Sequence, residues 1–356
     1  MERSSLAFLK KLLATPSVTS QEARGIRVWV DYVKKFADRV ETDAYGNAYA
    51  FLNEKGSPKV MVTGHADEIG FMVRYVDGDG FIYMAGVGGV DRALVRGQRV
   101  HIHSKKGPVL GVIGSLPVHL QDHKDDDKKV PELHEIFVDI GAKNKKDALK
   151  RVEIGDTITY VDDFQILNGT IAVARGFDNR IGTFAAAEAL RLLSEAKKPN
   201  ACVVAVATVQ EEIGLNGAAM AGYNLHPDVA IVADVGHALD VPGIQKPKHG
   251  EASLGKGPIL GLGSANHPVV VDRLRSVARA RKIPLQVSLD PNYTSTDADA
   301  ISVARGGIPT ACLGLPNRYM HTPVETIDLK DLDQLVRLMA AFAGSLSGGE
   351  RFKVRI

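Results

Sequence analysis

The sequence contains few cysteines, which limits how the chain can be stabilised. Only Cys202 and Cys312 occur among 356 residues, and each lies inside an apolar run. A disulfide framework uses more cysteines in a shorter chain, so these two predict buried, reduced thiols in a reducing compartment. Neither has a neighbouring cysteine at the spacing of a zinc site, which argues against metal binding through sulfur.

The sequence also lacks a charge bias and a long hydrophobic run. Its formal charge of +2 argues against a dedicated nucleic-acid-binding protein, which would show a clustered basic surface. No stretch reaches the roughly 18 apolar residues of a membrane span. Near the N-terminus, Leu6, Phe8, Leu9, Leu12 and Leu13 recur at helical spacing, which predicts an amphipathic helix rather than a signal peptide. We therefore expect a cytoplasmic protein without nucleic-acid or membrane partners.

The sequence does contain apolar runs that each lead into acidic or histidine residues. The runs are short and rich in β-branched residues, which is typical of buried strands in a mostly parallel sheet. They cover 60–63, 201–209, 229–233 and 310–315. In open α/β sheets the ligand site lies beyond the carboxyl ends of the strands. The acidic and histidine residues that follow these runs are therefore candidates for one shared site.

The rest of the chain predicts an α/β fold with an insertion. Helical patterns are expected at 181–196, 272–281 and 329–346. The stretch 70–165 instead has many glycines and short alternating runs, which indicate a small β-barrel or sandwich. We expect a mixed, mostly parallel sheet sandwiched by helices, formed by 1–69 and 166–356, with a small β-barrel-like domain inserted at 70–165. Within the insertion, the charged segment 122–129 is expected to be a solvated loop.

Two candidate residues follow the first run. His65 and Asp67 are two positions apart, so on a strand-like segment they face the same side, and Asp67 could orient a metal-binding imidazole. An ordinary loop histidine beside a carboxylate is the alternative. Asp178 precedes an alanine-rich helix, so it could cap that helix or bridge two cations with its two oxygens. The residues alone leave these alternatives open.

The adjacent Glu211 and Glu212 are the most informative local signal. They end a long apolar strand, where burying either carboxylate without a cation would be costly. One could bind metal while the other acts as a general base, although a solvated acidic turn is the alternative. Asp234 could form an Asx turn, His321 could be a surface histidine, and His237 is expected to be structural.

Considered together, five of these residues form one mixed set of nitrogen and oxygen donors. The set is His65, Asp178, Glu212, Asp234 and His321. Such donors suit two divalent ions of hard or borderline character, with zinc or cobalt expected and manganese also compatible.

The segments that carry these residues resemble a known family. GHADEIGF, RGFDNRIG, QEEIGLNGA, ADVGHA and RYMHTPVE, in this order, are similar to the tetrahedral aminopeptidases, the glutamyl and deblocking aminopeptidase family. Some members carry an older endoglucanase-like label. LLATPSVTSQE and TSTDADA also resemble the family, so the resemblance covers nearly the whole chain. The sequence departs from the pattern at Ser295, where a glycine is expected.

The resemblance implies a role for each candidate ligand. His65 and Asp234 would complete one metal site, Glu212 and His321 would complete the other, and Asp178 would bridge both. It also implies that the inserted β-domain makes contacts between subunits, in a tetrahedral dodecamer built from dimers.

The resemblance further implies that Glu211 is the general base and that Asp67 orients His65. The expected activity is removal of N-terminal residues from peptides: Glu211 takes a proton from the attacking water and passes it to the leaving amine. A glycoside hydrolase that uses Glu211 and Glu212 without metal is one alternative. A dinuclear deacylase or carboxypeptidase is a second alternative, and an assembly protein with a relic site is a third.

Overall fold

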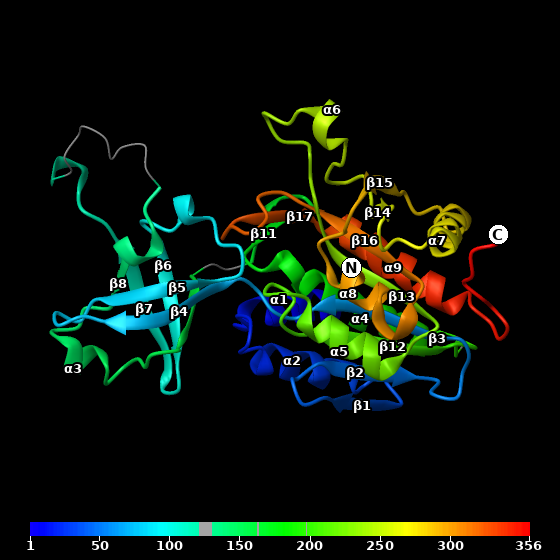
Figure 1. The fold of residues 1–356 in the computed structure, drawn as a ribbon, viewed down its shortest axis with the longest axis horizontal. Coiled ribbons are helices and arrows are strands. Elements are labelled where there is room, and N and C mark those ends of the chain that lie inside the picture. Colours follow the sequence, from blue (N-terminus) through cyan, green and yellow to red (C-terminus); the bar gives the residue numbers. More distant parts are fainter. Residues whose placement is uncertain (121–129, 162–163, 197) are drawn as a thin grey trace.

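The structure is a computed structural model that describes residues 1–120, 130–161, 164–196 and 198–356. It consists of two lobes, an α/β body and a smaller β-barrel that lies to one side of the body (Figure 1). The predicted solvated loop at 122–129 lies outside the described residues. Within the described parts of the chain, no helix has the length and apolar character needed to cross a membrane.

The α/β body is built on an eight-stranded sheet with the order β1-β2-β12-β3-β13-β16-β14-β15. Its strands are β1 (Arg39–Thr42), β2 (Ala48–Leu52), β3 (Lys59–His65), β12 (Cys202–Thr208), β13 (Val229–His237), β14 (Ile259–Leu262), β15 (Gln286–Leu289) and β16 (Thr310–Asn317). The neighbours β12, β3, β13 and β16 run parallel to one another. Strands β2 and β14 pair antiparallel to this group on its two sides. The predicted mixed, mostly parallel sheet is therefore confirmed, with the four apolar runs as its four central strands.

Helices cover both faces of this sheet. One face carries α1 (Arg3–Ala14), α2 (Ala23–Val33), α4 (Phe177–Glu195), α7 (Pro268–Ala280) and α9 (Leu329–Gly344), and the other carries α5 (Asn216–Leu225) and α8 (Asp297–Ser302). Because side chains alternate along a strand, Val60 and Val62 of β3 join the core under α4, whereas Met61 joins the core under α5. The short helix α6 (Lys246–His249) projects away from the sheet (Figure 1).

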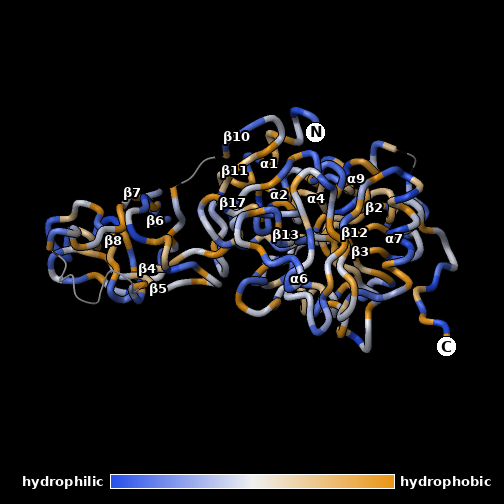
Figure 2. The backbone as a smooth tube through the Cα atoms, turned by 90° about the horizontal axis from the view of Figure 1, so that it is seen from above, coloured by the Kyte–Doolittle hydropathy of each residue, from blue (hydrophilic) through white to orange (hydrophobic). Residues whose placement is uncertain are grey.

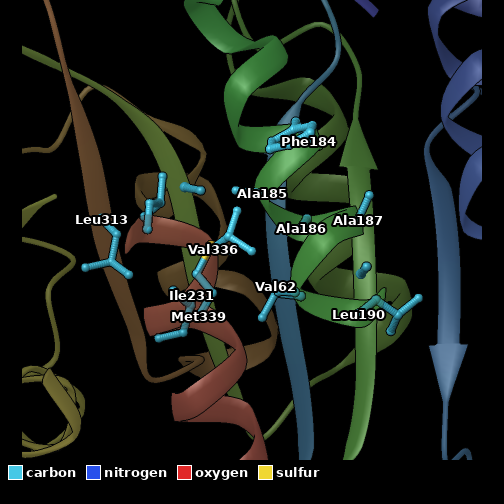
Figure 3. Packing of buried hydrophobic residues seen from close by; sticks show 14 of the residues in the cluster. Val62, Phe184, Ala185, Ala186, Ala187, Leu190, Ile231, Leu313, Val336 and Met339 are labelled. Carbon is cyan, nitrogen blue, oxygen red and sulfur yellow. The ribbon is translucent and has the colours of Figure 1, made fainter. Parts of the chain in front are cut away.

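Helix α4 lies directly against the centre of the sheet. Figure 3 shows Val62, Ile231 and Leu313, from three neighbouring strands, among the side chains that pack with α4 and α9. A Cβ atom on Gly64 would lie 2.4 Å from the backbone of Gly182, so only glycine permits this close approach of β3 to α4. The first turn of α4 is thereby held next to the end of β3.

Two element boundaries differ from the predicted ones for physical reasons. Helix α4 begins at Phe177 rather than near residue 181, but Asp178 and Asn179 have non-helical backbone angles and are joined by a cis peptide bond. Strand β13 continues past Ala233 to His237, because its backbone keeps pairing with β16 up to Asn317. Asp234 therefore lies within a strand rather than in a turn after it.

The second lobe is a closed antiparallel barrel with the strand order β4-β5-β8-β7-β6-β9. Its strands are β4 (Gly70–Val76), β5 (Ile82–Val87), β6 (Arg99–Ser104), β7 (Gly107–Gly114), β8 (Phe137–Asp139) and β9 (Thr157–Tyr160). Large apolar side chains such as Phe71, Met84 and Ile102 fill its interior. Along the backbone of both lobes, hydrophobic stretches alternate with hydrophilic ones (Figure 2).

Short elements complete the chain. A three-stranded sheet consists of β10 (Gln165–Asn168), β11 (Ile171–Ala174) and β17 (Glu325–Asp328). The remaining pieces are α3 (Lys145–Ala148), η1 (Arg92–Leu94), η2 (Val118–Leu120), η4 (Leu133–Glu135) and η5 (Ala304–Gly306). Strand β17 begins four residues after His321, so it helps to fix the position of that histidine.

Candidate metal centre

The predicted site residues meet at one edge of the sheet. His65 ends β3, Glu211 and Glu212 follow β12, Asp234 lies in β13, and His321 follows β16. Because these four strands are parallel neighbours, their carboxyl ends lie together. The first turn of α4 adds Asp178, and all six side chains line one cleft of about 780 Å³.

Asp178 lies between the two histidines. One of its oxygens, Oδ1, is 3.2 Å from Nε2 of His65, and the other, Oδ2, is 3.2 Å from Nε2 of His321. The described residues contain three groups of possible ligand atoms, each with its atoms within 4.8 Å of one another. One group is His65, Glu211 and Glu212. The other two are His65, Asp178 and Asp234, and Asp178, Glu212 and His321. Asp178 is common to these last two groups, so the arrangement has room for two neighbouring cations that share one carboxylate.

The electrostatics of the cluster favour added positive charge. Burial raises the pKa of Glu212 and Asp234 well above the ordinary range, and the nearby Asp178 charge adds to this effect. Burial opposes the charged form of His65, but the carboxylates of Glu211 and Asp178 outweigh it and raise its pKa. In addition, Oε1 of Glu212 is buried without a hydrogen-bond partner. Without cations the protein must hold protons on this cluster, and divalent ions would remove that need.

Asp67 organises more of the site than the sequence suggested. Nδ1 of His65 lies 3.2 Å from the backbone carbonyl of Asp67 and 3.4 Å from its carboxylate, and the carboxylate accepts a hydrogen bond of 2.9 Å from the hydroxyl of Thr19. It also accepts hydrogen bonds of 3.1 Å from the backbone N–H groups of both Glu211 and Glu212. One fully buried carboxylate therefore links the end of β3 to the loop after β12.

Glu211 projects into the cleft beside the metal-ligand cluster. Its Oε2 lies 3.7 Å from Nε2 of His65, and its side chain is only 10% exposed. The side chain of Glu212 is 6% exposed, so the alternative of a solvated acidic turn is wrong. Burial raises the pKa of Glu211 to about 7, with His65 opposing the shift and Asp297 adding to it. A carboxylate with this pKa can both accept and return a proton near neutral pH.

Two further buried carboxylates, which were not among the predicted site residues, lie next to the metal-ligand cluster. Glu325 is buried in β17 and accepts backbone hydrogen bonds from Asp178 at 2.9 Å and from His321 at 3.0 Å. Asp297 is buried at the start of α8 and accepts a hydrogen bond from the hydroxyl of Thr208. Glu325 lies in the segment RYMHTPVE and Asp297 in TSTDADA. Their presence in segments that resemble the family was the one sequence feature that could have indicated a role at the site.

The remaining alternatives can be compared with the structure. Gly176 stands at the N-cap of helix α4, and Oδ1 of Asn179 accepts a 2.8 Å hydrogen bond from the N–H of Gly182, so Asp178 does not serve as the capping residue. His237 is exposed and lines the cleft rather than packing in the core. Ser295 has a φ of 56°, in the left-handed region that favours glycine, so the loop keeps that backbone shape without the glycine.

Known proteins resemble this chain in both sequence and fold. The sequence profile described as M42 glutamyl aminopeptidase matches residues 46–338. A lysyl aminopeptidase of Pyrococcus furiosus is 37% identical over 95% of this chain and 96% of its own length. The crystal structure of a TET aminopeptidase from a marine sediment archaeon of the Thaumarchaeota has a TM-score of 0.92 and 32% identity, with 97% of each chain covered.

A second solved structure resembles the chain over its full length. The TET1 peptidase of Pyrococcus horikoshii, which can assemble into a tetrahedron or a large octahedral shell, has a TM-score of 0.86 and 32% identity. The match covers 96% of this chain and 100% of that one. The profile and the relatives identify a hydrolase of peptide bonds, and the chain belongs to the M42 glutamyl aminopeptidase family.

Proposed function

We propose that this aminopeptidase releases N-terminal residues from peptides by using two divalent metal ions that share Asp178. The observation that carries the proposal is the position of Asp178, whose two oxygens each lie 3.2 Å from a different histidine. A carboxylate that only stabilised one histidine would not need both oxygens directed in this way. Separate ligand groups on its two sides are the arrangement that a two-metal hydrolase requires.

The chain's donors suit zinc or cobalt, with manganese also compatible. His65 and Asp234 would hold one ion, Glu212 and His321 the other, and Asp178 both. When bound, two such ions would polarise the scissile carbonyl and lower the pKa of the attacking water. The unpartnered Oε1 of Glu212 and the raised pKa values in the cluster support this fit.

Two further residues act on protons and on orientation. Glu211 takes a proton from the water that attacks the first peptide bond and then gives it to the leaving amine. Its position in the cleft and its raised pKa support this role. Asp67 orients the imidazole of His65 from behind, and its hydrogen bonds to the backbone of Glu211 hold the base in position.

The two lobes have different roles, catalysis in the α/β body and assembly in the β-barrel. Residues 1–69 and 166–356 form the catalytic unit, and residues 70–165 form the inserted unit through which copies of the chain associate. Support comes from apolar side chains on the outer surface of β7, where Leu110 and Val112 are 53% and 46% exposed. A solved relative forms a dodecamer, and we infer a homo-oligomer of the same tetrahedral kind, built from dimers. The two free, buried cysteines are consistent with a cytoplasmic location.

A chelation experiment with matched substrates tests the proposal. The protein is treated with EDTA, dialysed, and assayed on leucyl-p-nitroanilide and on its N-acetylated form, before and after zinc, cobalt or manganese is added. We expect activity only on the free-amine substrate, loss of that activity after chelation, and recovery with at least one of the ions.

Each alternative predicts a different result. Activity on a β-glucan that survives EDTA would indicate a glycoside hydrolase. Release of acetate from the acetylated substrate, without release of p-nitroaniline from the free amine, would indicate a deacylase. Release of C-terminal residues from a free peptide would indicate a carboxypeptidase. No turnover of any aminoacyl substrate with any ion, with basic, acidic and apolar residues all tested, would indicate an assembly protein with a relic site.

A further inference from the structure

The cleft extends beyond the metal centre, along the sheet toward β14 and β15. Asp234 pairs in register with Gly314 of β16, and Gly314 pairs with Ile259 of β14. Gly261 lies two residues beyond Ile259, so it is on the same face and roughly 7 Å farther along the strand. The glycines leave a shallow floor that begins beside the metal-ligand cluster and ends at Gly261.

A carboxylate stands at the far end of this floor. Oδ2 of Asp290 lies over Gly261, only 2.4 Å from where a Cβ atom would be, so any larger residue there would displace Asp290. The buried Asn266 donates a hydrogen bond of 3.2 Å from Nδ2 to this oxygen. Oδ1 of Asn266 accepts a 2.7 Å hydrogen bond from the backbone N–H of Cys312, which leaves only its NH₂ group to face Asp290.

The carboxylate of Asp290 accepts the hydrogen bond from Asn266, but no cation in the part of the chain that the structure describes neutralises it. Among the described residues, no lysine, arginine or histidine forms an ion pair with it, and its side chain is only partly buried. Burial raises the pKa of Asp290, and the charged group that acts on it is a second carboxylate, Asp299. The carboxylate of Asp299 accepts hydrogen bonds from Thr294 and Ser295, so its role is to stabilise the loop that contains these residues.

We propose that Asp290 selects peptides with a basic N-terminal residue, by pairing with the side-chain cation of lysine or arginine. This inference rests on the proposed function, which places the N-terminal residue next to the metal centre. From there, an extended basic side chain runs along the floor of the cleft. Ile259 and Val287 line the same cleft and contact its methylene groups, while Asp290 receives the charged end.

The rim of the cleft carries basic side chains, whereas the far end of its floor carries the carboxylate of Asp290. Lys246, Lys248 and His249 of α6 also line the cleft, but all three are exposed, and Lys246 already pairs with Glu251. An acidic N-terminal residue that reached these groups would remain largely in water, where a charge pair contributes little. Asp290 is held in place at the end of the floor, so the structure favours a basic side chain over an acidic one.

The test compares two substrates that differ mainly in the charge at the end of the side chain. Lysyl-p-nitroanilide and norleucyl-p-nitroanilide are assayed with the metal-loaded wild type, and arginyl and glutamyl substrates are added to the panel. A hydrogen-bonded charge pair that is partly desolvated corresponds to about 10- to 100-fold in kcat/KM. We expect lysyl to exceed norleucyl by this factor, with arginyl close to lysyl and glutamyl lowest.

Two variants distinguish a specific effect of Asp290 from the general effect of negative charge in the cleft. Asp290→Asn keeps the size of the side chain and should lower the lysyl kcat/KM by about tenfold or more, while the norleucyl value changes little. Glu251→Gln removes a carboxylate from the same cleft that is 70% exposed, and it should preserve the lysyl preference. Product inhibition of the wild type by free lysine and by norleucine gives a measurement that needs no variant.

The outcomes are distinct. Equal or better turnover of norleucyl or glutamyl substrates by the wild type would overturn the proposal, as would a lysyl preference that survives in Asp290→Asn. If Asp290→Asn loses activity on both the lysyl and the norleucyl substrate, the inhibition constants of free lysine and norleucine for the wild type decide. Lysine that inhibits no better than norleucine would contradict the role of Asp290. Failure to cleave any aminoacyl substrate would instead refute the proposed function itself.

Discussion

The interior of the β-barrel is almost entirely apolar, whereas the α/β body buries acidic groups beside one another. In the described part of the barrel, the buried polar side chains are three hydroxyl residues, Ser104, Thr157 and Thr159. In the body, several carboxylates are buried within one cleft or directly behind it: Asp67, Asp178, Asp234, Asp297 and Glu325. Buried charges are costly unless they are paired, hydrogen-bonded or bound to a metal.

The two lobes are therefore stabilised in different ways. The barrel closes its hydrogen-bonded ladder and needs no ligand to satisfy its interior. The body instead buries several carboxylates close together, and bound cations would stabilise this arrangement. On its outer surface the barrel exposes apolar side chains of β7, whereas the reactive groups of the body line a cleft. We therefore expect catalysis and metal binding to depend on the body, and association of subunits to depend on the barrel.

The largest effect is expected from Asp178→Ala. Loss of the shared carboxylate removes a ligand from both groups that contain it, so both ions and at least about a thousandfold in kcat/KM should be lost together. Metal content by mass spectrometry and turnover on the preferred substrate measure the two effects. Asp272→Ala, in which a side chain that is 79% exposed is truncated on α7, serves as the control. Two ions per chain retained in Asp178→Ala would contradict the shared site.

Glu211→Gln should separate metal binding from chemistry. Glutamine keeps the size of the side chain but cannot accept the proton, so kcat should fall by about 10²- to 10⁴-fold while metal content stays at the wild-type level. Steady-state kinetics and metal analysis of the same preparation provide the check. A variant with nearly normal kcat would remove Glu211 from the role of base.

Glu325→Gln is expected to have a smaller effect that concerns positioning. The amide would turn an NH₂ group toward the backbone N–H of either Asp178 or His321, in place of an accepting oxygen. Groups behind metal ligands typically change metal affinity by about 10- to 100-fold. Competition with a chromogenic chelator measures this affinity. If only the unfolding midpoint of the metal-free protein changes, Glu325 has a purely structural role.

Leu110→Asp should have the smallest effect on chemistry and should act on assembly. A charge placed on the exposed apolar surface of β7 would weaken association between copies, while metal content and turnover per chain remain close to wild type. Light scattering coupled to size-exclusion chromatography measures the assembled mass. Tyr45→Asp alters a side chain that is 60% exposed on the body, and it should leave the assembly intact. An unchanged mass for Leu110→Asp would place the interface elsewhere.

Much of the fold followed from local patterns. The four apolar runs became β3, β12, β13 and β16, because short β-branched segments with few polar residues are stable only where both faces are buried. The predicted N-terminal helix and the helix before residue 196 were also confirmed. The start of α4 was predicted less well, because the irregular backbone at Asp178 is set by contacts with other elements.

Local sequence patterns were enough to identify which donors stand at the ends of the central strands. They also indicated that a parallel sheet would bring those ends together, since this depends on the periodicity of each segment alone. Three relations became visible only in the folded structure. Asp178 faces both histidines, Glu325 accepts hydrogen bonds from the backbones of Asp178 and His321, and Asp290 ends the cleft. These relations join residues from distant parts of the chain, so they depend on how closely helices and strands pack. Local patterns carry no information about such distances.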